Sequence, residues 1–584
     1  MKQSDPAPLA ILLLILLTLA LLLGRLTWTG DESRYCYQAI ALANGHLVQP
    51  GADAWRAFLV RSALDPAGFS YGTTARPLVS VWTSALYTPA LASLGLEAAR
   101  WQSFVFVACG LVLLERTLRT NGAPGYGRLI PIVATACVAL SVPVLAFARV
   151  VYPEAALFAL TAAGLFATAH RRAVFLAAVA IALPFVHIRA LPLSAAFVVL
   201  TICGTSWRSR LRANAGLAAT YLAGMLVFVA SQIALYGSAH GTAFSGYTPS
   251  LETIVPRLGM QLFDARHGII PYWPAALVGF AGLLAGSLRD DRLCRVASVL
   301  LGTCVLTFAW ATASESWTAR YWVAAMPMLG VGIAAFFRYA SSAVARALAA
   351  LPIVLSLANL GLFVAQPVLF LANRRGSTSY YILSLTTNVD LGTLLPIDEG
   401  PDAGALPPFA DPLPAAMLFF VAVVAGLAVA AALRSRRASA LASLATFAVM
   451  LIPFADGYAT PVLARAATVI QTARDGRSIA IATDGAAPPT ERIRLDGLVG
   501  RFWSRPRYAP MFALRCIRSD LVLDAFATPS RPSLRFPTPC PGGATIEIAE
   551  LGPGGAIFGS RTAVTLFAAP RLPFAANRPQ GTPP

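Results

Sequence analysis

Long apolar segments that carry almost no charge recur along most of this 584-residue chain. Hydrophobic residues make up 57% of the sequence and charged residues 12%, about half the charged fraction of a soluble protein. A helix of about 20 apolar residues crosses the hydrocarbon core of a bilayer. Runs long enough to do so occupy 8–27, 101–118, 129–148, 153–169, 173–187, 190–206, 215–236, 270–287, 296–313, 321–337, 346–368, 415–433 and 439–455. The sequence therefore predicts a mainly α, polytopic transmembrane helical bundle of about 13 spans.

The topology depends on whether a further apolar run, 77–96, spans the membrane, because one additional span would move every later loop to the opposite side. If it does not span, all the basic clusters between later runs share the side of the N-terminus, as the positive-inside rule requires. These clusters are Arg116/Arg119/Arg128, Arg171/Arg172, Arg208/Arg210/Arg212, Arg289/Arg292/Arg295, Arg338/Arg346 and Arg434/Arg436/Arg437. We therefore predict an interfacial or re-entrant helix at 77–96, a cytoplasmic N-terminus and a C-terminus on the outer face.

The net charge of +18 comes almost entirely from Arg in short clusters between apolar runs. That distribution is typical of loops facing anionic membrane lipids and argues against a nucleic-acid partner. The first apolar run could be a cleaved signal peptide, but its length and the lack of a small-x-small cleavage site favour an uncleaved span. We expect a multi-pass protein of a bacterial inner (plasma) membrane.

The composition changes after residue 456, where short apolar alternations are separated by Gly- and Pro-containing turns. We predict a transmembrane domain at 1–456 with an outer loop at 28–100 that contains interfacial helices, a small β-containing outer domain at 457–570 and a disordered tail at 571–584. Cys516 and Cys540 lie in the outer domain. They form either a disulfide or two free thiols.

Three acids fall where runs meet the predicted outer face. Asp31 and Glu32 follow the first run, and Glu154 begins another run just after Pro153. Acids in a first helical turn can simply complement the helix dipole. A carboxylate drawn into an apolar helix, however, is costly without a partner. We predict catalytic roles for all three and leave open whether Asp31 or Glu32 is the base.

Several cations and aromatic residues fall on the same predicted face. Outer Arg is disfavoured unless something anionic is nearby, and the guanidinium fork suits phosphate. Aromatic residues at these places are also expected as interface anchors. The predicted lipid-phosphate ligands are Arg34, Arg76, Arg149, Arg266, His267, Arg320 and Tyr321.

Carboxylates beside Arg suit a reaction between a lipid-linked phosphate donor and a hydroxyl acceptor. We expect a membrane glycosyltransferase with a carboxylate base. The alternatives are a transporter or flippase of envelope glycans, which would place charges inside spans, and a non-enzymatic envelope assembly protein. No metal site or other cofactor is predicted from the Cys and His spacing, although outer acids could hold a divalent ion.

The order of these motifs resembles the GT-C class of integral-membrane glycosyltransferases, in the branch of protein O-mannosyltransferases and lipid A aminoarabinose transferases. The resemblance rests on Gly-Asp-Glu-Ser-Arg-Tyr at 30–35, Arg-Pro-Leu at 76–78, Glu-Ala-Ala-Arg-Trp at 97–101 and the segment 149–154. It implies a polyprenyl-phosphate-linked sugar donor, an outer-face site, inversion at the anomeric carbon and a first-loop acid as base. Many members carry Asp where Glu154 stands and Lys or His where Arg76 stands. The acceptor, whether glycan, lipid or protein, does not follow from the resemblance.

Overall fold

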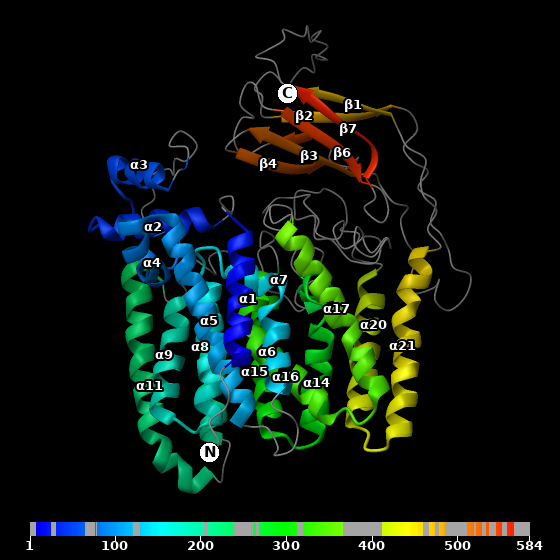
Figure 1. Ribbon diagram of the computed structural model, residues 1–584. Coiled ribbons are helices and arrows are strands. Elements are labelled where there is room, and N and C mark those ends of the chain that lie inside the picture. The colour runs from blue at the N-terminus through cyan, green and yellow to red at the C-terminus, as the bar shows by residue number, and fades with distance from the viewer. Residues whose placement is uncertain are drawn as a thin grey trace, which may run out of the picture.

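The computed structural model describes residues 7–24, 31–62, 64, 76–77, 79–120, 129–203, 207–238, 258–259, 261–263, 268–311, 319–365 and 412–458, together with seven strands beyond them. The helical part forms one bundle around a single large apolar core (Figure 1). Its first half contains α1 (Ala7–Leu22), α2 (Glu32–Ala43), α3 (Ala52–Arg61), α4 (Val81–Leu94), α5 (Leu96–Thr120), α6 (Leu129–Ala139), α7 (Val142–Phe147), α8 (Pro153–Ala169), α9 (Ala173–Val186), η2 (Ile188–Ala190), α10 (Leu191–Cys203) and α11 (Trp207–Tyr236).

The second half contains α13 (Ile269–Tyr272), α14 (Ala276–Leu288), α15 (Arg292–Ala311), η3 (Arg320–Ala325), α16 (Met326–Tyr339), α17 (Ala343–Ala365), α20 (Pro412–Ala432) and α21 (Arg436–Tyr458). Among the described residues, four helical stretches are long and apolar enough to cross a membrane, namely Leu96–Thr120, Ala215–Tyr236, Arg320–Tyr339 and Ala343–Gly361. Shorter apolar helices accompany them. These helices support a membrane location and confirm the mainly α class, while the number of 13 spans stays a prediction.

Helix α4 runs along one end of the bundle. Its first residue, Val81, donates its backbone N–H to the Tyr236 hydroxyl at the end of α11, and the Ser80 hydroxyl that caps it donates to the Phe185 carbonyl at the end of α9. At its other end only Gly95 separates it from α5. Helix α4 therefore begins beside the ends of α9 and α11 and ends next to the start of α5. The interfacial or re-entrant character of 77–96 stays a prediction.

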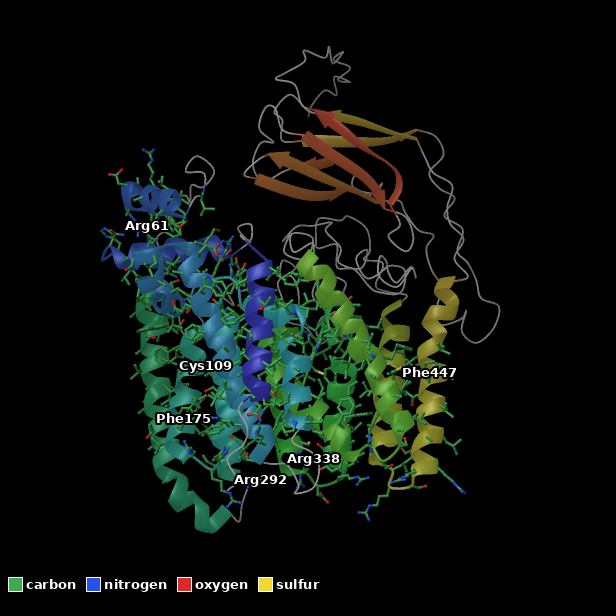
Figure 2. All side chains as sticks on the ribbon, in the orientation of Figure 1. Arg61, Cys109, Phe175, Arg292, Arg338 and Phe447 are labelled. Carbon is green, nitrogen blue, oxygen red and sulfur yellow. The ribbon has the colours of Figure 1, made fainter. Side chains whose placement is uncertain are left out.

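Helices α2 and α3 lie at the end of the bundle where the C-terminal end of α1 lies (Figure 1). Arg292 and Arg338 lie at the opposite end from Arg61 (Figure 2). Two members of the predicted basic clusters thus share the end at which α1 begins. We call the end that carries α2, α3 and α4 the site face.

The strands beyond α21 form two antiparallel sheets. Their bounds are β1 (Ala467–Thr472), β2 (Ser478–Asp484), β3 (Met511–Arg518), β4 (Leu521–Ala527), β5 (Ser533–Arg535), β6 (Thr545–Leu551) and β7 (Ile557–Thr565). One sheet has the order β1-β2-β5 and the other β4-β3-β6-β7. Strands therefore occur where a β-containing domain was predicted, but its boundaries stay a prediction. The tail at 571–584 and Cys540 lie outside the described residues.

Helices α14 and α16 approach each other through glycine. A methyl group on Gly282 would lie 1.8 Å from the carbonyl oxygen of Gly332, and one on Gly332 would lie 1.9 Å from the carbonyl oxygen of Gly279. Only glycine fits such a backbone contact. The close packing holds α16 against α14, and α16 follows directly after η3, which carries Arg320.

We expect Gly282→Ala to lower the free energy of unfolding by about 1–3 kcal/mol, because the two backbones must separate to admit the methyl group. Gly302→Ala is the matched control, since its added methyl group would meet nothing within 4 Å. Thermal unfolding of both variants in detergent measures the difference. Equal melting temperatures for the two variants would contradict the contact.

Candidate functional site

Arg320 lies between two carboxylates from distant parts of the chain. Its Nε donates to Glu154 Oε1 at 2.6 Å, and its Nη1 donates to Asp31 Oδ2 at 2.8 Å. The side chain of Arg320 is 7% exposed and that of Glu154 3%, whereas Asp31 is 33% exposed. Asp31 is therefore the carboxylate of this pair that an incoming molecule can reach.

Local backbone conformation explains how these side chains meet. Asp31 directly precedes α2, and Glu154 follows Pro153, which is preset for the first turn of α8. Ala319, just before Arg320, has φ of 52°, in the left-handed region that non-glycine residues seldom adopt. Such backbone strain is characteristic of functional sites and here sets the direction in which η3 begins.

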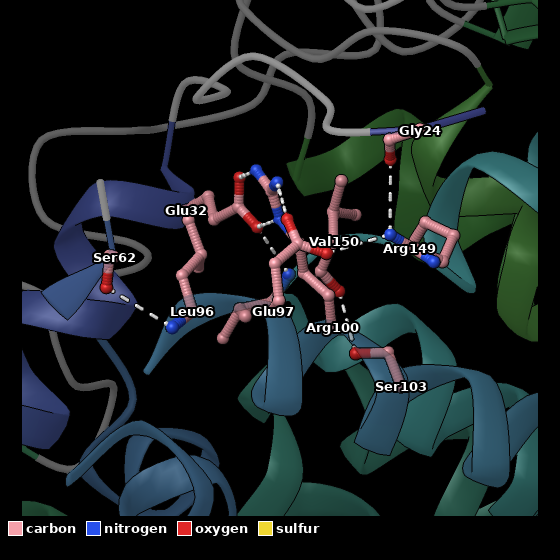
Figure 3. Close-up of polar contacts among 10 residues, drawn as sticks. Gly24, Glu32, Ser62, Leu96, Glu97, Arg100, Ser103, Arg149 and Val150 are labelled. Carbon is pink, nitrogen blue, oxygen red and sulfur yellow. Dashed lines mark hydrogen bonds and ion pairs between the residues drawn. The ribbon is translucent and has the colours of Figure 1, made fainter. Parts of the chain in front are cut away.

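Glu32 faces a different partner (Figure 3). Arg100 Nε donates to Glu32 Oε1 at 3.0 Å and Arg100 Nη2 donates to Glu32 Oε2 at 2.8 Å. Oε1 also accepts the backbone N–H of Val151 at 2.9 Å. The Glu32 side chain is 0% exposed and that of Arg100 1%. Both Glu32 oxygens are thus held in a buried, bidentate ion pair, and it is Asp31 that meets Glu154 through Arg320.

The segment 149–152 is buried but not helical. Non-helical backbone at membrane depth is tolerated only where other protein groups satisfy it. Ser103 donates to the Val150 carbonyl at 2.7 Å, Tyr87 donates to the Tyr152 carbonyl at 2.9 Å, and Val151 N–H donates to Glu32. Polar side chains of α2, α4 and α5 therefore fix the segment that leads directly to Glu154.

Arg149, a predicted phosphate ligand, is engaged by the protein itself. Its Nη2 donates to Glu97 Oε2 at 2.8 Å and to the Gly24 carbonyl at 3.2 Å, and its Nη1 donates to the Ala20 carbonyl at 3.3 Å. The guanidinium also lies 4.1 Å from the centre of the Trp101 ring. A cation at these carbonyls complements the C-terminal end of α1. Arg149 thus links α1 to α5 and pairs with Glu97, not with Glu154.

Arg189 and His187 complete the charged group around Glu154. Arg189 Nη2 lies 3.9 Å from Glu154 Oε1, and its guanidinium lies 4.1 Å from the centre of the Tyr321 ring. The backbone N–H and Nε of Arg189 both donate to Nδ1 of His187. The His187 ring therefore orients the Arg189 side chain.

The other predicted ligands lie in different surroundings. Arg34 is exposed, and its Nη1 donates to Asp31 Oδ1 at 3.0 Å. Arg76 is exposed and lies beside Gly237, at the end of α11. Tyr321 is half-buried and stacks on Phe308, and the Arg189 guanidinium lies over its ring. Arg266 and His267 lie outside the described residues.

The pKa of Asp31 reflects competing influences. Burial raises it, but the charge and hydrogen bond of Arg320 and the charges of Arg34 and Arg189 lower it more, so the net pKa lies below the ordinary value. Asp31 is therefore ionised at neutral pH and can accept a proton. Because the pKa is depressed on folding, this group stabilises the fold above its unfolded pKa and loses that contribution as the pH falls through the folded value.

Glu97 and Arg100 belong to the 97–101 segment that carries the resemblance, but neither they nor Ser103 and Tyr87 are among the predicted site residues. An Arg close to the start of an apolar helix was a usable signal, because a buried charge requires a partner. No such sequence signal exists for the hydroxyls of Ser103 and Tyr87, because their role depends on the non-helical segment 149–152 that they contact. Among the described residues, no three His, Cys, Asp or Glu side chains gather as a metal site would require.

No protein-family model matches the chain, and no curated protein is similar to it in sequence. Two solved structures are similar in fold, both of ArnT from Cupriavidus metallidurans. The one bound to undecaprenyl phosphate has 14% sequence identity and a TM-score of 0.39, with 76% of each chain covered. The apo structure has 16% identity and a TM-score of 0.37, with 75% of each chain covered.

Proposed function

We propose that the chain is a membrane glycosyltransferase that moves a sugar from a polyprenyl-phosphate donor to a hydroxyl acceptor at the site face. The observation that carries the proposal is the shared Arg320, which joins an accessible carboxylate, Asp31, to a buried one, Glu154. An ionised acid beside a cation offers a proton acceptor and an anion ligand within one site.

Asp31 is the base in this proposal. It accepts the proton of the acceptor hydroxyl, whose oxygen attacks the anomeric carbon from the side opposite the phosphate. The bond between that carbon and the phosphate oxygen breaks, and the polyprenyl phosphate leaves with one additional negative charge. The configuration at the anomeric carbon is therefore inverted. Glu32 does not serve as base, because both its oxygens are held by Arg100 and Val151.

Arg320 and Arg34 bind the donor phosphate. Both guanidiniums pair with Asp31, the accessible carboxylate, and that of Arg34 is half-exposed. As negative charge grows on the leaving phosphate, both guanidiniums interact with it more strongly. As the two guanidiniums turn to the phosphate, their interaction with Asp31 weakens, and the affinity of the Asp31 carboxylate for the proton rises. Arg76, Arg266, His267 and Tyr321 are proposed to line the path of the donor lipid.

A divalent cation is not needed between Asp31 and Glu154, because the Arg320 guanidinium already occupies that place. Arg149 has a structural role in this proposal, since Glu97 and the carbonyls of α1 engage its terminal nitrogens. By the positive-inside rule, the site face lies on the outer side of a bacterial inner membrane.

Transfer from a polyprenyl-phosphate sugar to a simple alcohol, assayed with the full chain in nanodiscs, tests the proposal. Asp31→Asn is expected to lower the transfer rate by roughly 10²- to 10⁴-fold, because the proton acceptor is lost. Asp53→Asn, an exposed acid of α3, is the matched control and should retain full activity. Full activity in Asp31→Asn would remove the proposed base. No turnover by the unmodified chain with any polyprenyl-phosphate sugar would remove the function.

The dependence of kcat/KM on pH should report the depressed pKa of Asp31. We expect activity to hold through mildly acidic pH and to fall only below the ordinary carboxyl range. Arg34→Gln removes one of the charges that lower this pKa, so the acid limb should move upward by less than about one pH unit. Arg56→Gln, on the exposed side of α3, is the control. A downward shift in Arg34→Gln would contradict the assignment of the limb to Asp31.

A further inference from the structure

Two buried polar atoms beside Arg320 have no hydrogen-bond partner among the described residues. They are Oε2 of Glu154 and Nη1 of Arg189. Buried polar atoms almost always have a partner, and one left without a partner destabilises the protein by an amount comparable to a lost hydrogen bond. This pair therefore points to a molecule that binds here and supplies the missing contacts.

The two atoms belong to side chains whose other contacts fix them. Arg320 Nε donates a hydrogen bond to Oε1 of Glu154, so the carboxylate oxygen without a partner is Oε2. Arg189 is oriented by the ring of His187 and lies over the ring of Tyr321. The nearest approach of the two side chains is 3.9 Å, between Arg189 Nη2 and Glu154 Oε1. The two orphaned atoms thus belong to one group of neighbouring charged side chains from α8, η2 and η3.

The chemistry of the two atoms restricts what binds. A carboxylate oxygen only accepts a hydrogen bond, and a guanidinium N–H only donates one. Hydroxyl groups can satisfy both, because each hydroxyl donates and accepts. A phosphate oxygen cannot donate to Glu154, and an ammonium group cannot accept from Arg189. Neutral hydroxyls fit this pair better than either charged group.

The charges around Glu154 and Arg189 agree with a neutral ligand group. Asp31 and Glu154 are negative, while Arg34, Arg189 and Arg320 are positive, and all five are joined by ion pairs. The local excess is one positive charge, which the single negative charge of a donor phosphodiester balances. A cationic sugar would restore the excess next to the buried Glu154, Arg189 and Arg320, where unbalanced charge is costly.

We infer that Glu154 and Arg189 form a subsite for the hydroxyl groups of the transferred sugar, so that the donor carries a neutral sugar and not a cationic amino sugar. The inference rests on the proposed function, because it concerns the sugar of the same donor. Arg320 and Arg34 hold the phosphate in this arrangement, and Glu154 and Arg189 select the sugar attached to it.

Equilibrium binding to the full chain in nanodiscs tests the inference with three lipids that share one polyprenyl chain. They are sugar-free polyprenyl phosphate, a neutral hexosyl or pentosyl donor, and the same donor with one hydroxyl replaced by an amine. We expect the neutral donor to bind roughly 10- to 100-fold more tightly than the amino-sugar donor, as two unsatisfied buried groups predict. It should also bind more tightly than the sugar-free lipid.

Arg189→Met should reduce the ratio between the affinities for the neutral donor and the sugar-free lipid by roughly tenfold. Arg172→Met, an exposed residue beside the other end of α9, should leave that ratio unchanged. If Arg189→Met does not fold, the comparison of the three lipids on the unmodified chain still decides the matter.

The results of these binding measurements distinguish a failure of the sugar-subsite inference from a failure of the proposed function. Equal or tighter binding of the amino-sugar donor would overturn the inference and make Glu154 a ligand for a cation. Equal binding of the neutral donor and the sugar-free lipid would also overturn it, while leaving the phosphate site in place. If none of the three lipids binds, the proposed function fails, and the inference fails with it.

Discussion

Arg320→Met is expected to abolish sugar transfer and to lower the free energy of unfolding by about 3–5 kcal/mol. The loss of stability arises because Glu154, which is 3% exposed, would keep a buried charge without its main partner. The loss of transfer arises because the donor phosphate loses the guanidinium that its growing charge requires. Unfolding in detergent and transfer in nanodiscs measure the two effects separately.

Two further variants distinguish the roles of Arg320. Arg320→Met combined with Glu154→Gln removes the unpaired buried charge, so most of the lost stability should return while transfer stays absent. Arg320→Lys retains the positive charge but loses the planar fork that contacts Asp31 and Glu154 together, and it should restore little transfer. Wild-type transfer by the stable double variant would show that Arg320 has only a structural role.

Arg100→Met is expected to destabilise the fold by a similar amount, about 3–5 kcal/mol, because Glu32 would be left charged at a fully buried position. Adding Glu32→Gln should restore most of that stability, since a neutral amide carries no charge and can still accept the Val151 N–H. Thermal unfolding of the single and double variants gives the comparison. Unchanged stability in Arg100→Met would contradict the buried ion pair.

The sequence predicted the helices and placed Asp31, Glu32 and Glu154 near one face, because apolar length and charge placement constrain a membrane protein strongly. It favoured a meeting of Glu32 with Glu154, whereas in the structure Asp31 meets Glu154 through Arg320. It did not separate Asp31 from Glu32. Neighbouring residues at a helix start point in directions about 100° apart. Which of them meets solvent and which meets Arg100 depends on how α5 packs beside α2, and that is a tertiary contact.

The partner of Arg149 also could not be predicted from the sequence. An Arg at the predicted outer face was interpreted as a phosphate ligand, but Glu97 and the end of α1 engage its terminal nitrogens. The charge pattern indicated correctly that an anionic or carbonyl partner was needed. It could not indicate that the partner lay within the protein, because Glu97 and Arg149 are far apart in sequence and come together only through the packing of α5 against α8.

We assign Asp31 as the base and Glu32 as a buried structural acid. The most direct test compares transfer by Asp31→Asn with transfer by the Glu32→Gln, Arg100→Met double variant, after both have been shown to fold and to bind polyprenyl phosphate. We predict that Asp31→Asn binds the lipid but transfers roughly 10²- to 10⁴-fold more slowly, while the double variant retains transfer within about tenfold of the unmodified chain. Retained transfer in Asp31→Asn together with lost transfer in the double variant would contradict the claim.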